Sequence, residues 1–150
     1  MLLRDPDYQA LQGVWEQTAL EDNGVSNPVD DAHSAPGAIT IISDDRFEVL
    51  TVNGETLLAG QFFLDSSTHP KSITWIDAIG EDAGRQLPAS YRLEKDQFVF
   101  IAADEGMPRP SVFSTGPGQT MRSFVRRSES ALHPDLRQHF HKAFTFRSIG

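Results

Sequence analysis

Short segments in which apolar and polar residues alternate follow one another along most of this chain, with turn-forming residues between them. A period of two residues puts successive side chains on opposite faces of a β-strand. Short alternating segments bounded by Gly, Pro, Asn and Asp are typical of an antiparallel barrel or sandwich. The pattern predicts strands over residues 11–20, 38–43, 46–52, 55–65, 72–79, 90–94, 97–103, 111–115 and 119–127.

The connections between these strands carry their own signals. Asn53-Gly54 is the strongest hairpin signal, because both residues accept the positive φ of a type I′ turn. Gly60, inside a predicted strand, predicts a bulge or a sharp bend. Residues 22–37 form the longest connection, and residues 80–89 form a polar loop. A connection as long as 22–37 is typical of a functional or mobile segment, and we expect it beside a mouth of the barrel.

Helical signals appear only near the two ends of the chain. Residues 1–10 predict a loose lead-in or a short helical turn, with Tyr8 and Leu11 as a plug for one end of the barrel. Apolar residues recur every four positions near the C-terminus, which predicts a helix over about 133–145: Leu136, Phe140 and Phe144. Several predicted strands are apolar on both faces, so we expect this helix to cover the barrel or to cap an open end.

Composition narrows the class of protein. A length of 150 residues predicts one domain, and the absence of cysteine excludes disulfides, thiolate metal sites and a cysteine nucleophile. The net charge of -8 argues against nucleic acid and anionic membranes as partners. No secretory signal and no apolar run of transmembrane length is visible, so we expect a cytoplasmic protein.

Gly13-Val14-Trp15 opens the first predicted strand, and Arg126 and Arg127 stand in the last one. This combination resembles the lipocalins, in which a Gly-x-Trp opens the barrel and a late arginine lies across the tryptophan ring. The resemblance implies a cation–π contact with Trp15, with Arg126 as the first candidate. We favour a structural role for Trp15 and Arg126 in closing the barrel; the alternative is a floor that touches a ligand.

A bacterial lipocalin-like domain family of uncharacterised proteins, first noticed in planctomycetes, is similar to the chain over about residues 10–127. The matching segments are residues 11–15, 20–24, 62–65, 70–73, 91–94 and 109–115. The most distinctive is the Arg-Pro-x-x-Phe-x-Thr element that begins at Arg109. The resemblance implies the barrel, but it transfers no functional residues, because the family carries no established activity or ligand.

We therefore predict an all-β fold, a lipocalin-like antiparallel β-barrel of eight to nine strands over about residues 10–127 with a C-terminal α-helix. A barrel of this size holds side chains or one small ligand. The favoured function is non-enzymatic binding of a small apolar or amphipathic molecule, with Arg109 holding its polar end. For the Arg109 element taken by itself, we favour hydrogen bonding of its guanidinium to loop carbonyls, which would fix the turn. Five aromatic residues are predicted to line the cavity: Phe47, Phe62, Trp75, Phe98 and Phe100.

A second hypothesis is an acidic protein-binding module, such as an inhibitor or immunity protein for a basic toxin or enzyme. Residues 1–110 contain 7 Lys and Arg against 19 Asp and Glu, whereas residues 111–150 contain 6 against 2. Carboxylates on one rim steer a basic partner and raise its association rate. The candidate partner-binding residues are Asp30, Asp31, Glu81, Asp82, Asp104 and Glu105.

An enzyme of unknown type is the third hypothesis. The sequence holds no Gly-x-Ser-x-Gly element, and the 114–120 segment lacks the lysine and the glycine spacing of a phosphate loop. His139 and His141 fall on different sides of the predicted helix, and the other histidines show no converging pattern. We therefore predict no catalytic residue, no cofactor and no metal site.

Overall fold

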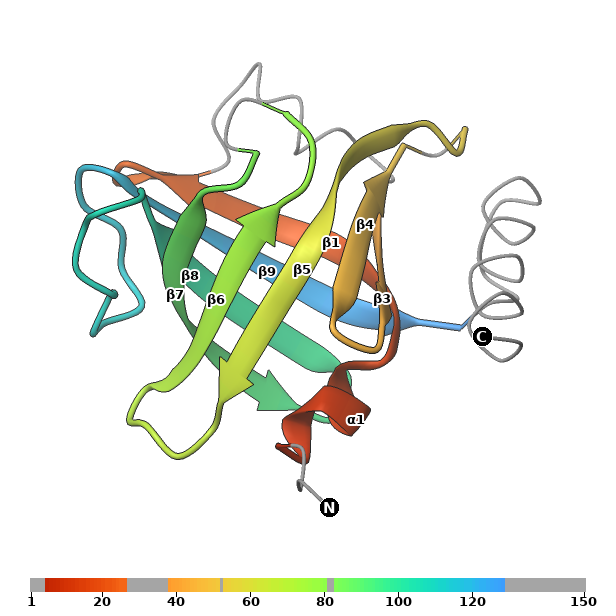
Figure 1. The fold of residues 1–150 in the computed structure, drawn as a ribbon, viewed down its shortest axis with the longest axis horizontal. Coiled ribbons are helices and arrows are strands. Elements are labelled where there is room, and N and C mark those ends of the chain that lie inside the picture. The colour runs from red at the N-terminus through yellow and green to blue at the C-terminus, as the bar shows by residue number, and fades with distance from the viewer. Residues whose placement is uncertain (1–4, 27–37, 52, 81–82, 129–150) are drawn as a thin grey trace.

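The computed structural model describes residues 5–26, 38–51, 53–80 and 83–128. The predicted C-terminal helix lies outside this part of the chain. The described elements are one helix and nine strands (Figure 1): α1 (Asp7–Leu11), β1 (Gly13–Asp22), β2 (Val25–Ser26), β3 (Ile39–Ser43), β4 (Arg46–Leu50), β5 (Thr56–Asp65), β6 (Lys71–Asp77), β7 (Gln86–Glu94), β8 (Gln97–Ala103) and β9 (Gln119–Arg127). Within the described residues, no helix is long and apolar enough to span a membrane.

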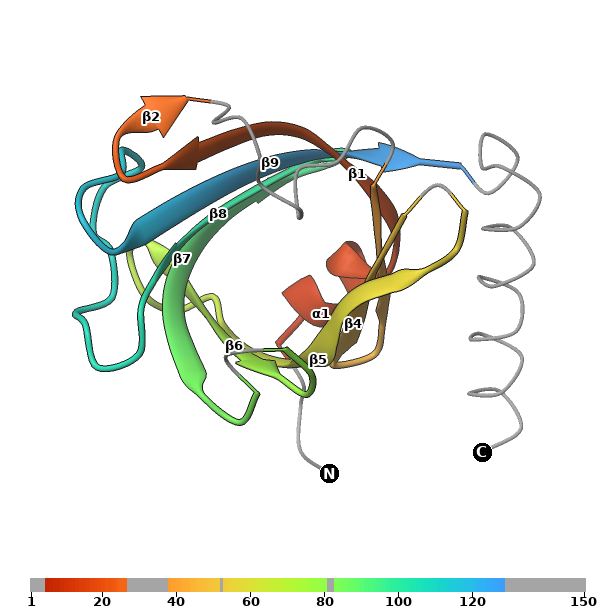
Figure 2. The same cartoon turned by 90° about the horizontal axis from the view of Figure 1, so that it is seen from above.

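The strands form one closed antiparallel sheet. From β3 to β9 each strand pairs with the next one in sequence, and β1 pairs with β3 on one side and with β9 on the other. Eight strands therefore make a ring, and the two-residue β2 pairs with the last two residues of β1. Figure 2 shows this ring from above. The predicted lipocalin-like antiparallel barrel is confirmed by this strand order and by the β1–β9 pairing.

Alternation along the strands separates an inner from an outer apolar cluster. The inner cluster contains most of the aromatic residues of the barrel and includes Trp15, Phe62, Phe98 and Phe124. Residues adjacent to inward ones face outward, and four of these form a second buried cluster on β1, β3 and β4: Val14, Ile39, Ile41 and Leu50. The double apolar faces noted in the sequence thus belong to two separate packing layers.

The short helix α1 lies at one end of the barrel, here called the α1 end (Figures 1 and 2). Tyr8 stacks on Phe62 with ring centroids 5.6 Å apart, and its hydroxyl accepts a hydrogen bond from the Leu64 backbone N–H. Leu11 is completely buried. The sequence therefore predicted correctly that a helical turn bearing Tyr8 and Leu11 plugs the barrel.

Polar contacts hold α1 against the neighbouring strand ends. The Tyr91 hydroxyl donates to the Asp7 carboxylate at 2.7 Å, and Lys71 Nζ lies 3.0 Å from the same carboxylate. Burial and the bond to Asp7 raise the pKa of Tyr91, so its hydroxyl stays a donor at neutral pH. The Asp5 carboxylate accepts hydrogen bonds from the backbone N–H and the hydroxyl of Ser66. These contacts fix the plug in place.

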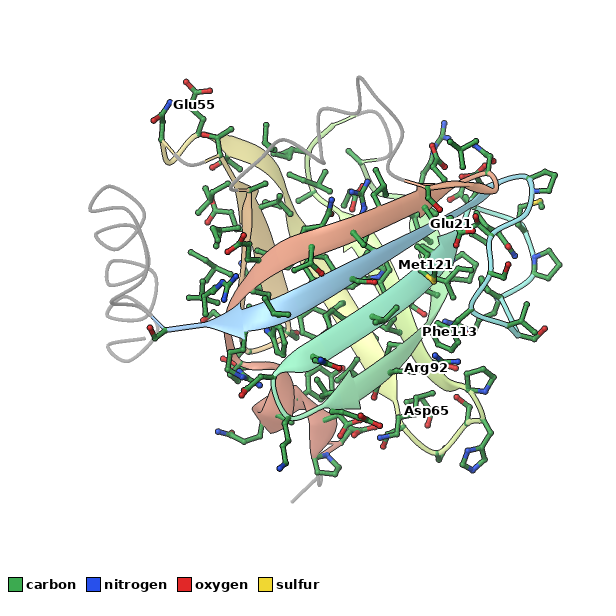
Figure 3. All side chains as sticks on the ribbon, turned by 180° about the vertical axis from the view of Figure 1, so that it is seen from behind. Glu21, Glu55, Asp65, Arg92, Phe113 and Met121 are labelled. Atoms are coloured by element: carbon green, nitrogen blue, oxygen red, sulfur yellow. The ribbon has the colours of Figure 1, made fainter. Side chains whose placement is uncertain are left out.

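The strands differ most from the predictions at two places. β7 begins at Gln86, so Pro88 lies inside a strand, opposite Thr74, and the polar loop before it is shorter than expected. Residues 111–115 form no strand. They belong to an outer strap, residues 104–118, that is held by side chains: the Ser90 hydroxyl donates to the Pro110 carbonyl. The Arg92 guanidinium lies 3.9 Å from the centre of the Phe113 ring (Figure 3).

The predictions for two glycines also need correction. The register is regular at Gly60, and the shift lies instead where Val49 and Leu50 pair with Leu58 and Thr56, so the extra residue is Leu57 of β5. Gly60 is required for space, because a Cβ there would lie 2.1 Å from the Ile76 carbonyl oxygen. In the β4–β5 connection Gly54 has φ +89°, and its N–H donates to the Thr51 carbonyl at 2.9 Å. Gly54 therefore closes a turn instead of standing at its centre beside Asn53, so the predicted type I′ turn is wrong.

Candidate functional site

A cavity of about 420 Å³ lies inside the barrel, above the aromatic floor at the α1 end. Its wall is mainly apolar and comes from every strand of the ring. The aromatic part consists of Trp15, Phe47, Trp75, Phe98, Phe100 and Phe124. The aliphatic part consists of Ile42, Val49, Leu57, Leu58, Leu87, Ala102 and Ala103.

Trp75 is the centre of the aromatic wall. Its ring centroid lies 4.8 Å from that of Phe100 and 5.0 Å from that of Phe47, the latter in an edge-to-face arrangement. Such contacts contribute about 0.5–1.5 kcal/mol each beyond the burial of area. Because the indole is supported by other rings on more than one side, the wall is preorganised rather than collapsed into the cavity.

Six polar or charged residues interrupt the apolar wall: Gln17, Thr40, Asp77, Asp104, Thr120 and Arg122. Arg122 Nη1 donates a hydrogen bond to Gln17 Oε1 at 2.9 Å. Arg122 is not among the site residues predicted from the sequence, although the sequence contains a signal for it. Arg122 and Phe124 are two positions apart on β9, so the buried ring of Phe124 places the arginine on the same inward face.

Four of the predicted ligand-binding residues line the cavity: Phe47, Trp75, Phe98 and Phe100. Phe62 does not. It is completely buried below the cavity, between Tyr8 and Trp75, and belongs to the packing of the plug. The sequence shows which face of a strand a residue occupies, but not its depth along the barrel axis.

Arg109 is also not among the residues that line the cavity. Its guanidinium donates to the backbone carbonyls of Ile73 on β6 and Ala89 on β7, at 2.9 and 2.6 Å, and to the Thr74 hydroxyl at 3.0 Å. Burial lowers the pKa of Arg109 while the Asp65 carboxylate acts in the opposite direction, and the group remains charged at neutral pH. The favoured role of Arg109, hydrogen bonding to carbonyls, describes these contacts, except that the carbonyls belong to strands instead of a loop.

The predicted acidic rim is described only in part. Asp30, Asp31, Glu81 and Asp82 lie outside the described residues. Asp104 lines the cavity where β8 ends, and its backbone N–H donates to the Gly118 carbonyl. Glu105 is the next residue of the same connection and is exposed. The role of these carboxylates in partner binding remains a prediction.

Trp15 lines the cavity, and Arg126 lies over its ring. The indole is completely buried, its Nε1 donates to the Leu11 carbonyl at 2.8 Å, and the Arg126 guanidinium lies 4.3 Å from the ring centre. Gly13 has φ +128°, and a Cβ there would lie 3.2 Å from Arg126 Nη1. The glycine at position 13 therefore leaves room for Arg126 to cover the ring of Trp15.

Metal-ligating side chains do not gather anywhere in the described part of the chain: no group of three or more His, Asp or Glu residues is arranged to hold an ion. The polar residues of the cavity are instead spread over different strands among apolar ones. This arrangement can orient an organic ligand by hydrogen bonds.

Comparisons with known proteins give little further information. No protein-family profile matches the chain, and no curated protein matches it significantly. The resemblance to the planctomycete family therefore remains a prediction. Among solved structures, apocrustacyanin C1 aligns over 93% of this chain and 72% of its own, with 15% identity and a TM-score of 0.42. At that similarity the assignment of the fold rests on the strand order and barrel closure described above.

Proposed function

We propose that this chain is a binding protein that holds one small, predominantly apolar molecule inside its barrel. The observation that supports this proposal is the cavity of about 420 Å³ with its aromatic and aliphatic wall. Ligand sites are typically concave, mostly apolar and roughly 300–1,000 Å³ in volume, with a few polar groups that orient the ligand.

A merely structural barrel would be expected to fill its own interior. Protein cores are close-packed, and each Å³ of unfilled apolar cavity lowers stability by about 24 cal/mol in engineered cases. The interior here is rich in large inward side chains, yet the rings of Trp75, Phe47 and Phe100 support one another along the wall and leave the centre unfilled. A bound apolar molecule accounts for this arrangement.

The test is a fluorescence titration with N-phenyl-1-naphthylamine, an uncharged apolar probe that brightens on burial. Ala102→Trp places an indole in the cavity from the inner face of β8, and we expect at least a tenfold loss of probe affinity. Val112→Trp adds the same group on the outer strap, where Val112 is 63% exposed, and is expected to bind like wild type. Equal binding by both variants, each with an unfolding midpoint near that of wild type, would overturn the proposal.

Native mass spectrometry of the protein isolated gently from its own cells identifies the natural occupant. A small-molecule adduct that dissociates when the ions are activated in the spectrometer supports the proposed binding function. A stoichiometric basic protein that is lost as salt rises would favour the acidic-module hypothesis instead, since charge-steered association weakens with ionic strength. If the protein carries no adduct and binds no apolar probe, the proposed function is wrong.

A further inference from the structure

Trp75 differs from Trp15 in one respect. Both indoles line the cavity and both are almost completely buried. Trp15 Nε1 donates to the Leu11 carbonyl, whereas Trp75 Nε1 has no hydrogen-bond acceptor among the residues that the structure describes. Among the described residues, one indole donor of this cavity wall is thus satisfied and the other is not.

The surroundings of Trp75 explain why no described residue accepts a hydrogen bond from this donor. Its ring neighbours are Phe47, Phe62 and Phe100, none of which has an oxygen or nitrogen in its side chain. The faces of aromatic rings are only weak acceptors. A buried donor without a partner destabilises a protein by about 1–3 kcal/mol, and buried polar groups in native proteins are almost always paired. The partner is therefore to be sought in what occupies the cavity.

Charge in the wall indicates which kind of acceptor fits. The charged residues that line the cavity are Asp77, Asp104 and Arg122, and Arg122 already donates to Gln17. Two carboxylates against one guanidinium give an anionic ligand no net electrostatic gain, and moving a charged carboxylate into an apolar wall is unfavourable. A neutral oxygen, such as that of a ketone, ester or amide, accepts from an indole N–H without this penalty.

We infer that the ligand is a neutral, predominantly apolar molecule with a carbonyl-type oxygen, and that Trp75 Nε1 donates a hydrogen bond to that oxygen. This inference rests on the proposed function and adds the chemical class of the ligand. It assigns Trp75 two roles, as an apolar wall and as the donor that selects among molecules of similar size and shape.

Two probes of matched size separate these roles: fluorenone, which carries a ketone oxygen, and fluorene, which lacks it. With only two tryptophans in the chain, the ¹H–¹⁵N spectrum has two indole signals, which Trp75→Phe assigns. We expect fluorenone to move the Trp75 indole proton downfield and fluorene to leave it without such a shift. The Trp15 indole, already bonded to Leu11, is the internal reference.

Affinities of the two probes complete the test. Trp75→Phe is expected to weaken fluorenone about three- to tenfold more than fluorene, the effect of one hydrogen bond. Phe100→Leu trims the same wall without removing a donor and is expected to weaken both probes equally. An equal loss of both probes in Trp75→Phe, or a Trp75 indole proton that is already hydrogen-bonded in the free protein, would overturn the inference and leave the proposed function intact. If neither probe enters the cavity, both the inference and the proposed function are wrong.

Discussion

The guanidinium of Arg126 lies 4.3 Å from the ring centre of Trp15 and, from the same position, donates to the backbone carbonyls of Gln12 and Ala10 at 2.7 and 2.6 Å. It also donates to the Lys95 carbonyl in the β7–β8 turn, at 3.2 Å. One side chain near the end of β9 therefore joins α1, the start of β1 and the β7–β8 turn.

Replacing Arg126 by Lys tests this joint. Lysine keeps the charge but loses the planar fork that reaches several carbonyls at once. We expect the free energy of unfolding, measured by urea denaturation, to fall by about 1–3 kcal/mol. Arg127→Lys is the matched control, because Arg127 is partly exposed and pairs with Glu16, so its effect should stay within about 0.5 kcal/mol. Similar losses in both variants would contradict the special role of Arg126.

Gly60→Ala tests the close approach of β5 to β6. A Cβ at this position would lie 2.1 Å from the Ile76 carbonyl oxygen, which is backbone and cannot turn away. We expect the variant to lose at least about 2 kcal/mol of stability by thermal or urea unfolding. Gly116→Ala is the control, since a Cβ added there would lie 3.9 Å from the nearest heavy atom, and it should unfold like wild type. An equally stable Gly60→Ala would show that the two strands separate without penalty.

Arg109→Lys distinguishes the two roles considered for Arg109. Its hydrogen bonds to Ile73 and Ala89 attach the outer strap to β6 and β7. We therefore expect stability to fall by about 1–3 kcal/mol, while the dissociation constant of the naphthylamine probe for the folded protein stays unchanged. The opposite result, weaker probe binding at full stability, would restore the hypothesis that Arg109 holds a ligand.

The plug is expected to loosen in acid. Burial acts to raise the pKa of Asp5, but hydrogen bonds from the Asp7 and Ser66 backbone N–H groups and the Ser66 hydroxyl outweigh it, and the pKa falls below its ordinary value. A lowered carboxyl pKa stabilises the fold above the unfolded value of about 3.9, and that contribution is lost as pH falls through the folded pKa.

Asp5→Ala provides the measurement. The variant should be less stable than wild type at pH 6, and the gap between their urea midpoints should narrow as pH falls below about 3.9. Glu105→Ala, at an exposed position in the 104–118 strap, should show no gap at either pH. A gap for Asp5→Ala that stays constant from about pH 6 to about pH 2 would mean that its charge contributes nothing to holding α1.

Alternation and turn residues were sufficient to predict the antiparallel strands, the plug and the inward face of the aromatic residues. That the strands close into a barrel was implied by the resemblance to lipocalins. The depth of a side chain along the barrel axis and the paths of the loops were not predictable in this way. Phe62 and Phe98 are both inward aromatic residues, but one packs under the plug and the other lines the cavity. Arg122 was overlooked because an arginine in an alternating strand is usually assigned to solvent, although its neighbour Phe124 fixes its direction.

The predictions for the strap and for the glycines were wrong for a different reason. The position of Arg109 depends on where a loop crosses two strands distant in sequence, and no local pattern records that path. Gly60 is required because the Ile76 carbonyl on the neighbouring strand leaves no space for a Cβ. In the sequence, a glycine inside a strand indicates only that space or flexibility is needed there. Pro88 was assigned to a loop because proline removes a backbone donor, yet β7 tolerates it opposite Thr74.

The pairing of β1 with β9 also constrains how this chain reaches its native state. Val14 pairs with Arg127, so the ring closes only when the last strand of the barrel is available. Until then β1 and β8 each present an edge without its final partner, and such edges are templates for pairing between molecules. A chain that ends before Gln119 is therefore expected to aggregate. Residues 119–127 prevent this because they cover the open edges of β1 and β8.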